Sequence, residues 1–237
     1  MTRMPLAALA AASLLVGASV SAQHAGHVTS PADEKIDASF DIIRTDVASA
    51  GSDIVFRVQV RGAAGAIRPR AVGQFAGSAV YSYVWPTSLD SAAVGFDAEQ
   101  GILALAVTFH PDFDDAAYGA VNRHVWHPHW VVLVPDAACG DGSLKVQDIP
   151  EGTTPKVPAT WPQVPLLIDS PSYPTTLETD TVEVRVPAEV IGATEGISFD
   201  GVTSALQVNA NLHAPLLCIA DVFDVASGDL SLPGRVR

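Results

Sequence analysis

Alternation of polar and apolar residues with a period of two is the dominant pattern along this chain. In "IVFRVQVRG", for example, Arg57 and Gln59 alternate with Phe56 and Val58. Such alternation is typical of a β-strand that buries one face, because successive side chains of a strand point to opposite sides. The pattern predicts strands within five stretches: 38–47, 54–62, 78–85, 181–187 and 204–213.

Two further stretches are almost continuously apolar, "ILALAVTF" (102–109) and "HWVVLVP" (129–135), and a strand-like segment, 216–225, comes near the end. Continuous apolar runs of this length are expected for strands that are covered on both faces. A proline-rich stretch, 150–174, is too irregular for a helix. The chain is therefore predicted to be all-β, an antiparallel β-sandwich with long irregular proline-rich connections.

The first residues have the pattern of an export signal. Arg3 precedes an apolar run, 5–20, and the small residues "VSA" that end the signal resemble a cleavage site. We therefore predict a signal peptide at 1–22. An exported protein of this kind is expected in the periplasm, outside the cell or on the cell surface.

The segment that follows the signal, 23–35, is polar and rich in small residues, which predicts a flexible N-terminal tail that carries His24 and His27. The remaining residues, 36–237, contain no internal repeat and are predicted to form a single β-sandwich domain. No later stretch is long and apolar enough for a membrane-spanning helix, which needs about 20 residues.

The chain is acidic, with 13 basic and 26 acidic residues and a formal net charge of −13. A chain of this charge is repelled by nucleic acid and by anionic membrane surfaces, so we expect neither as a partner. Acidity attracts cations, but it is also a general way for an exported protein to stay soluble. Charge alone therefore does not predict a metal site.

The two cysteines, Cys139 and Cys218, are expected to form a disulfide in an oxidising compartment. Both methionines, Met1 and Met4, lie in the predicted signal peptide. The mature chain then offers neither a thioether nor a free thiol to a soft metal ion, so such an ion would depend on imidazole.

Four of the seven histidines lie within 110–129, and three of them fall in "HVWHPHW". In an extended strand His127 and His129 point to the same face, with Cα atoms about 6.6 Å apart. That spacing lets two imidazoles converge on one ion at metal–nitrogen distances of about 2.0–2.1 Å. Pro128 has no N–H to donate, which places this segment at a sheet edge or a bulge.

A third ligand is needed to hold an ion well, and His213, at the end of an alternating strand, is our first candidate. His110 is the second. A simple hairpin from 102–109 to 129–135 would place His110 beside His124, about 10 Å from His127. We therefore expect His110 and His124 to form a pair of their own, unless Pro128 alters the register.

The stretch "HPDFDD" contains carboxylates at nearly alternate positions, Asp112, Asp114 and Asp115. Carboxylates are the ligands that calcium prefers, so calcium is a second candidate ion. The glycine and the distal glutamate of an EF-hand loop are absent, and an acidic solvated loop is the simpler interpretation.

Four stretches together resemble a known family: "YSYVWPTSLD", "LAVTFHPDFDD", "HPHWVVLVPD" and "LKVQDIP". They are similar to the copper-repressible surface copper-binding proteins of methane-oxidising bacteria, the MopE/CorA type, over roughly 40–225. The resemblance implies copper, largely Cu(I), held by two histidines that match His129 and His213. Some members add a tryptophan, oxidised to kynurenine, two residues before the first histidine. That position is His127 here, a departure that suggests three imidazole ligands instead.

These observations favour an exported, non-enzymatic copper-binding protein that sequesters or delivers copper, as Cu(I) or Cu(II), through His127, His129 and His213. Imidazole suits copper, zinc and nickel, and copper has the highest affinity of the three. Delivery would require a copper-handling or redox partner that the sequence does not identify. Whether His124 or Trp126 joins the ligands is left open.

Two alternatives remain. A haem- or small-ligand-binding β-sandwich would line an apolar pocket with the aromatic faces of its strands, namely Tyr81, Tyr83, Trp85, Trp126 and Trp130. A zinc-dependent hydrolase would use the same histidines to activate water. It ranks last, because the GxSxG and HExxH motifs are absent and no acid–base partner is evident.

Overall fold

The computed structural model describes residues 26–117, 121–192, 196–209 and 216–236. Nearly all of its regular structure is β, and every pairing between strands is antiparallel among these residues. This confirms the all-β antiparallel prediction. The predicted signal peptide, 1–22, lies outside the described residues.

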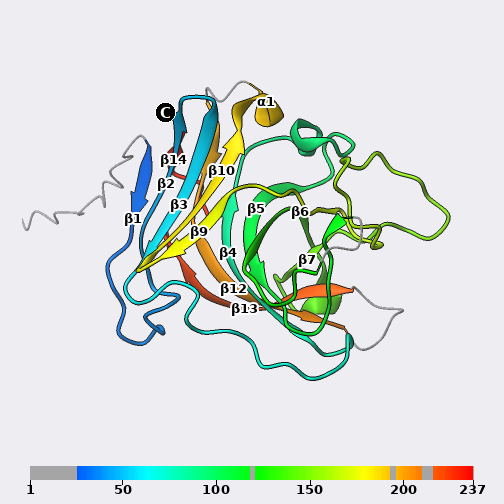
Figure 1. Cartoon of the computed structure of the whole chain (residues 1–237), viewed down its shortest axis with the longest axis horizontal. Coiled ribbons are helices and arrows are strands. Elements are labelled where there is room, and N and C mark those ends of the chain that lie inside the picture. The colour runs from blue at the N-terminus through cyan, green and yellow to red at the C-terminus, as the bar shows by residue number, and fades with distance from the viewer. Residues whose placement is uncertain (1–25, 118–120, 193–195, 210–215, 237) are drawn as a thin grey trace, which may run out of the picture.

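A five-stranded sheet forms one layer of the molecule (Figure 1). Its strands, in spatial order, are β1 (His27–Thr29), β2 (Ile42–Ala50), β3 (Asp53–Val60), β10 (Thr181–Pro187) and β9 (Thr175–Glu178).

The first strand of this sheet corrects the prediction of a flexible tail at 23–35. In the described part of that segment, β1 pairs with β2, and His27 lies opposite Asp46. Val28 is buried in the core, while Thr29 on the opposite face is exposed. Burial of one apolar side chain and pairing along three residues therefore hold this segment in the sheet.

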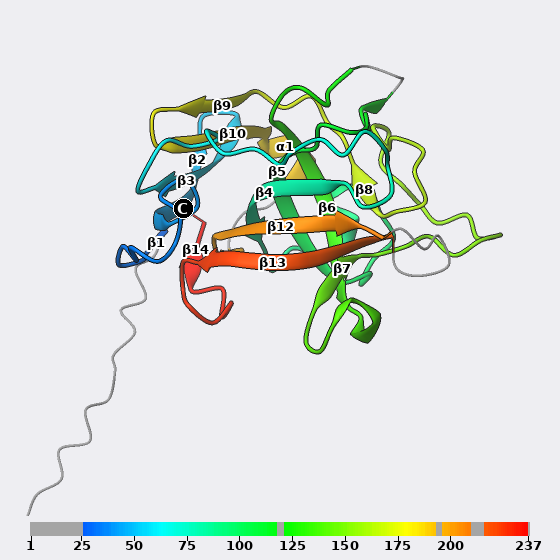
Figure 2. The same cartoon turned by 90° about the horizontal axis from the view of Figure 1, so that it is seen from below.

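The second layer closes on itself to form a six-stranded barrel. Going around the barrel, the strands are β5 (Ile102–Phe109), β4 (Ala79–Pro86), β12 (Val202–Val208), β13 (Leu217–Val225), β7 (Leu144–Val146) and β6 (His127–Pro135). Pairing of β6 with β5 completes the circle. A further short strand, β8 (Ile168–Asp169), pairs with β6 at Trp130 and Val131 but is not one of the six barrel strands. Figure 2 shows β12 and β13 side by side along the barrel.

This closure differs from the predicted sandwich, which is not confirmed. The sequence pattern identified the longer strands, since each of the eight predicted segments overlaps one of β2, β3, β4, β5, β6, β10, β12 and β13. It did not reveal which strands pair. β5 is hydrogen-bonded to β4 on one side and to β6 on the other, and this double pairing leaves no edge at that point.

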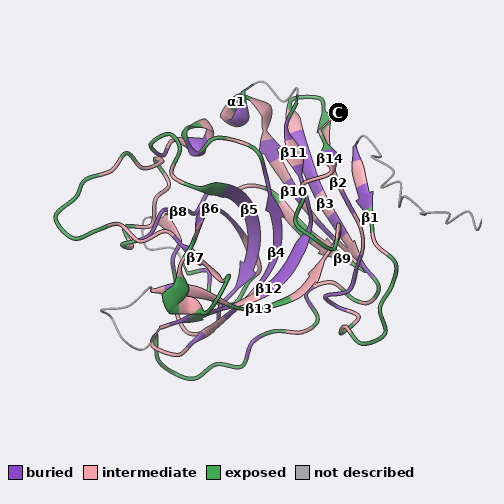
Figure 3. Ribbon diagram, turned by 180° about the vertical axis from the view of Figure 1, so that it is seen from behind, coloured by how far each residue is buried: buried purple, intermediate pink, exposed green. Residues whose placement is uncertain are grey.

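The main core lies between the sheet and the barrel. Trp85 and Trp130 are fully buried there and contact the ring of Phe56, which comes from the sheet. The opposite face of the same barrel strands carries a second set of apolar side chains, including Val84, Ala106 and Val131. β4, β5 and β6 therefore bury both faces, one against the sheet and one toward the barrel lumen. Figure 3 shows β4 and β5 buried along most of their length.

The remaining elements are short. They are the helix α1 (Ala188–Ile191), the 3-10 helices η1 (Ser91–Val94) and η3 (Ala137–Cys139), and a small two-stranded sheet of β11 (Ser198–Phe199) and β14 (Gly234–Arg235). The proline-rich stretch 150–174 is irregular apart from β8, as predicted. Within the described ranges no helix has the length and hydropathy to cross a bilayer.

The predicted disulfide is present. Cys139 in η3 is bonded to Cys218 in β13; the two residues are 79 positions apart in sequence, and their Cα atoms are 5.5 Å apart. Cys218 is also the residue of β13 that pairs with Lys145 of β7. The disulfide therefore reinforces the barrel at Cys218, where a single residue pair joins β13 to β7 in the part of the chain that the structure describes.

Replacing both cysteines, Cys139→Ser/Cys218→Ser, should lower the free energy of unfolding by about 4 kcal/mol, because the crosslink limits the entropy of the unfolded chain. Urea unfolding followed by tryptophan fluorescence measures this change. The wild-type protein in a reducing agent should match the variant, whereas the variant itself should not respond to the reducing agent. Equal unfolding midpoints for the two proteins would contradict a stabilising role.

Candidate metal centre

Two segments bring four ligand groups together at the barrel wall. β6 carries His127 and His129 on its lumen side, since the strand alternates and Trp130 points to the main core. β5 ends at Phe109, so His110 is the first residue of the loop that leads back to β6. The same loop supplies Asp115. Their side chains each place one ligand atom within 4.8 Å of the others.

Each of the three imidazoles is oriented by a backbone carbonyl. The Nδ1 of His110 donates to the carbonyl of Phe113 at 2.9 Å. The Nδ1 of His127 donates to Val125 at 2.9 Å, and that of His129 donates to Asp169 at 3.0 Å. A carbonyl can only accept, so each Nδ1 must carry the ring proton. Each neutral ring then presents the lone pair of Nε2, which is the arrangement found in metal-binding histidines.

The three Nε2 atoms converge on the Asp115 carboxylate. His110 and His127 each place Nε2 3.2 Å from Oδ1, and His129 places Nε2 3.5 Å from Oδ2. The Nε2 atoms of His110 and His127 are 3.0 Å apart. A tetrahedral ion with bonds of about 2.0–2.1 Å sets its ligand atoms about 3.3–3.4 Å apart. The observed spacings fall close to that value.

The short separation between His110 and His127 requires a positive charge. Two neutral rings with protonated Nδ1 atoms would direct two lone pairs at each other, which is repulsive. A proton or a metal ion between the nitrogens removes that repulsion. Burial lowers the pKa of His110, but its hydrogen bond and charge interaction with Asp115 outweigh burial, and the pKa is raised above its usual value. The group of residues therefore attracts a cation.

Burial and charge act in opposite directions on the pKa values of His129 and Asp115. Burial lowers the pKa of His129 to about 3, although Asp115 opposes this change, so the ring is neutral at physiological pH. Burial raises the pKa of Asp115, but His129, His110 and His127 outweigh it and hold that pKa well below its usual range. The site thus offers a neutral imidazole and an ionised carboxylate, both suited to a metal ion.

Asp115 is held by neighbours outside the ligand group. Its Oδ1 accepts from the Asn122 side-chain amide at 2.8 Å, and its backbone N–H donates to Asn122 Oδ1 at 3.2 Å. The backbone carbonyl of Asp115 accepts from Ser170 at 2.7 Å. The Asn122 amide also donates to His127 Nε2 at 2.9 Å, a hydrogen bond that an ion on that nitrogen would replace.

One ligand atom has no hydrogen-bond partner. His129 is fully buried, and its Nε2 is one of two buried side-chain polar atoms without a partner among the described residues. The other is the hydroxyl of Thr108 on the neighbouring strand. A buried polar atom without a partner destabilises the fold by about 1–3 kcal/mol. A bound ion at His129 Nε2 removes that penalty.

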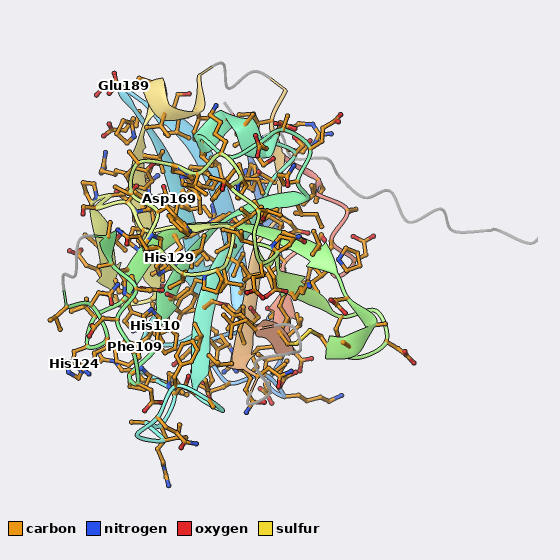
Figure 4. The ribbon with its side chains drawn as sticks, turned by 90° about the vertical axis from the view of Figure 1, so that its right-hand side faces the viewer. Phe109, His110, His124, His129, Asp169 and Glu189 are labelled. Atoms are coloured by element: carbon orange, nitrogen blue, oxygen red, sulfur yellow. A yellow bond between two sulfur atoms is a disulfide. The ribbon has the colours of Figure 1, made fainter. Side chains whose placement is uncertain are left out.

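The structure brings His127 and His129 together as the sequence predicted. The third predicted ligand, His213, lies outside the described residues, so its role stays a prediction. His110, ranked second, is part of the group. The expected pairing of His110 with His124 is wrong, since His124 is exposed and His110 contacts His127 instead. Figure 4 shows His110 and His129 in the interior and His124 toward the periphery.

The register explains the error about His110. The ladder pairs Thr108 of β5 with His127 of β6, so the strands separate before His124. His110 then extends past the last pair and folds toward His127. β8 pairs with β6 only at Trp130 and Val131, so Pro128 has a paired strand on the β5 side alone. This agrees with the predicted edge position of Pro128.

The three aspartates of "HPDFDD" do not form the proposed calcium site. Asp112 accepts from the backbone N–H groups of Val72 and Gly73. Asp114 accepts from two other backbone N–H groups, while Asp115 joins the histidines. The carboxylates therefore have separate partners. Sequence reasoning missed Asp115 as a partner of imidazole, although its position five residues after His110 was a usable signal.

The aromatic residues assigned to a ligand pocket belong to the main core instead. Trp85 and Trp130 pack against Phe56, and Tyr83 donates a hydrogen bond to the carbonyl of Ser39. Trp126 packs on Tyr83 and donates to a backbone carbonyl at Gly65, so it does not join the ligands. These side chains lie on the outer face of the barrel, opposite the lumen.

Comparisons with known proteins found no matching protein-family model, no similar curated protein and no similar solved structure.

Two histidines of the same loop provide a matched test of this geometry. The change His110→Ala should weaken the binding of copper(II) or zinc by at least about 100-fold, since loss of an outer-sphere group alone weakens it about 10–100-fold. The change His124→Ala should leave the affinity unchanged, because His124 is exposed and outside the group. Competition with a chromogenic chelator measures both. Equal affinities for the two variants would contradict this ligand set.

Proposed function

We propose that this protein binds one divalent transition-metal ion, with copper(II) as the first candidate, through His110, His127, His129 and Asp115. The convergence of three Nε2 lone pairs and one carboxylate in a buried place is the observation that supports the proposal. The four ligand atoms come from two chain segments that the barrel holds in register, so little reorganisation is needed when the ion enters.

The presence of Asp115 changes the expected oxidation state of the metal. A set of imidazoles alone suits Cu(I), as expected for His127, His129 and His213. A carboxylate is a harder, charged ligand and favours a divalent ion. Copper(II) has a higher affinity than zinc for a given set of nitrogen and oxygen ligands, which supports copper. The separations of 3.0–3.5 Å between ligand atoms, close to those around a tetrahedral ion, support zinc as the second candidate.

The biological role that we propose is copper sequestration or delivery outside the cytoplasm. Support comes from the signal-like segment 1–22 and from the resemblance to the methanotroph copper proteins. The disulfide between Cys139 and Cys218 agrees with an oxidising compartment. A copper-handling or redox partner belongs to this proposal as well. If His213 supplies a further ligand, the site would have five.

A neutral replacement of the carboxylate tests the proposal. The variant Asp115→Asn keeps the size of the side chain but removes its charge, and we expect copper(II) affinity to fall by at least about 100-fold. Asp112→Asn is the matched control. Among the described residues, the Asp112 carboxylate accepts hydrogen bonds from the backbone N–H groups of Val72 and Gly73, which belong to another loop. Its affinity should equal that of the wild type.

The measurement combines metal analysis of the purified protein with chelator competition for copper(II) and zinc. Electron paramagnetic resonance of the copper(II) protein should show nitrogen coupling that decreases in His129→Gln. Wild-type protein that retains neither metal, or an Asp115→Asn variant that binds copper(II) as tightly as the wild type, would disprove the proposed site.

A further inference from the structure

A cavity of about 1430 Å³, partly open to solvent, occupies the lumen of the barrel. Its walls are the lumen faces of the strands and are largely aliphatic, with Val80, Val84, Ala106, Val131, Leu133 and Leu206 among the lining residues. Aliphatic walls favour an apolar guest, because transfer of its surface out of water is favourable. The lumen therefore combines packed aliphatic walls with space for an apolar guest.

The metal centre forms part of the wall of this cavity. His110, Asp115 and His129 all line it, and so does Thr108. The two residues that carry buried polar atoms without hydrogen-bond partners, His129 and Thr108, thus both belong to the lining of the same space. Thr108 lies directly opposite His127 in the ladder, which places its hydroxyl on the same side of the sheet as the ligands.

Part of the apolar lining remains in contact with water. Four of the seven exposed large apolar side chains in the described residues line this cavity, namely Phe75, Ile102, Val222 and Leu230. Their exposed fractions lie between 39% and 46%. A guest that covers them would remove this surface from water, and the exposed residues show that the lumen communicates with solvent.

Charge determines the head group of the guest. A divalent ion and the Asp115 carboxylate together carry one net positive charge at this part of the wall. The other charged residues of the lining are one lysine, Lys145, and the carboxylates of Asp114, Asp136, Asp141, Asp148, Glu151 and Asp221. A monoanion would add a fifth ligand to the ion and neutralise this charge. Thr108 can donate its otherwise unpartnered hydroxyl to the same anion.

We propose that the barrel lumen binds an aliphatic monocarboxylate, with its carboxylate on the metal ion and its hydrocarbon chain along the lumen. The proposal rests on the proposed metal-binding function. It gives a ligand to the apolar cavity, which a protein that only stores a metal ion would not need. No bond within the ligand is broken, and the carboxylate takes the place of solvent on the ion.

Decanoate is the probe, and isothermal titration calorimetry on the copper(II)-loaded protein, after removal of excess ion, is the measurement. We expect one decanoate per protein and a shift of the copper(II) absorption band on binding. Each buried methylene should strengthen binding roughly fourfold, so hexanoate should bind distinctly more weakly. Decanol and acetate, which lack the head group or the chain, should each bind at least about 10-fold more weakly than decanoate.

A matched pair of variants on β6 separates the lumen from the outer face. Leu133 lines the cavity, about 13 Å along the strand from His129, whereas Val134 points to the other side. The variant Leu133→Trp should place an indole ring in the lumen beside the hydrocarbon chain and weaken decanoate binding, while copper(II) affinity stays unchanged. The variant Val134→Trp should bind both as the wild type does. Thr108→Val should weaken decanoate binding and leave decanol binding unaltered.

The outcomes distinguish this inference from the function on which it rests. Wild-type protein that retains neither copper(II) nor zinc overturns both. Metal-loaded protein that does not bind decanoate, or that binds decanol equally well, overturns the ligand alone. Metal-free protein that binds decanoate as tightly as the loaded protein overturns the coordination of its carboxylate. Decanoate binding by Leu133→Trp at wild-type affinity overturns the location in the lumen.

Discussion

The pairing of β5 with β6 is the interaction on which the rest of this structure depends. It closes six strands into a barrel, and it fixes which side chains face inward, because a shift of one residue would exchange the two faces of a strand. In the observed register Ala106 lies opposite His129, and Leu105 lies opposite Trp130. The tryptophan side packs against the five-stranded sheet, while the histidine side borders the lumen.

The metal centre follows from this register together with three backbone carbonyls. The ladder delivers two imidazoles on one face, and the loop beyond β5 returns a third imidazole and a carboxylate to them. Carbonyls of Phe113, Val125 and Asp169 then select the proton position of each ring. None of the three carbonyls belongs to a predicted ligand, but they decide that all the Nε2 lone pairs point inward. The geometry of the ligands is thus a property of the backbone.

The sequence predicted the strands and half of the ligand group, for identifiable physical reasons. Alternation is local, so the strands and the shared face of His127 and His129 could be derived from it. Closure of the barrel depends on pairing between strands that are distant in sequence, such as β7 with β13, and periodicity contains no such information. The place of His110 depended on where the ladder ends, and the support of His129 by Asp169 spans 40 residues. A single sequence does not reveal contacts of that kind.

The composition of the lumen face accounts for the cavity. Small barrels are usually filled by their own side chains, often through alternation of large and small residues. Here the row beside the metal centre is small, with Ser82, Ala106 and Ser204 among the lining residues, and the large aromatic side chains lie on the outer face of the same strands. The sheet therefore supplies a core that stabilises the barrel from outside. With stability provided there, the lumen can keep a cavity near a buried imidazole nitrogen that has no hydrogen-bond partner, an arrangement that close packing of the core does not require.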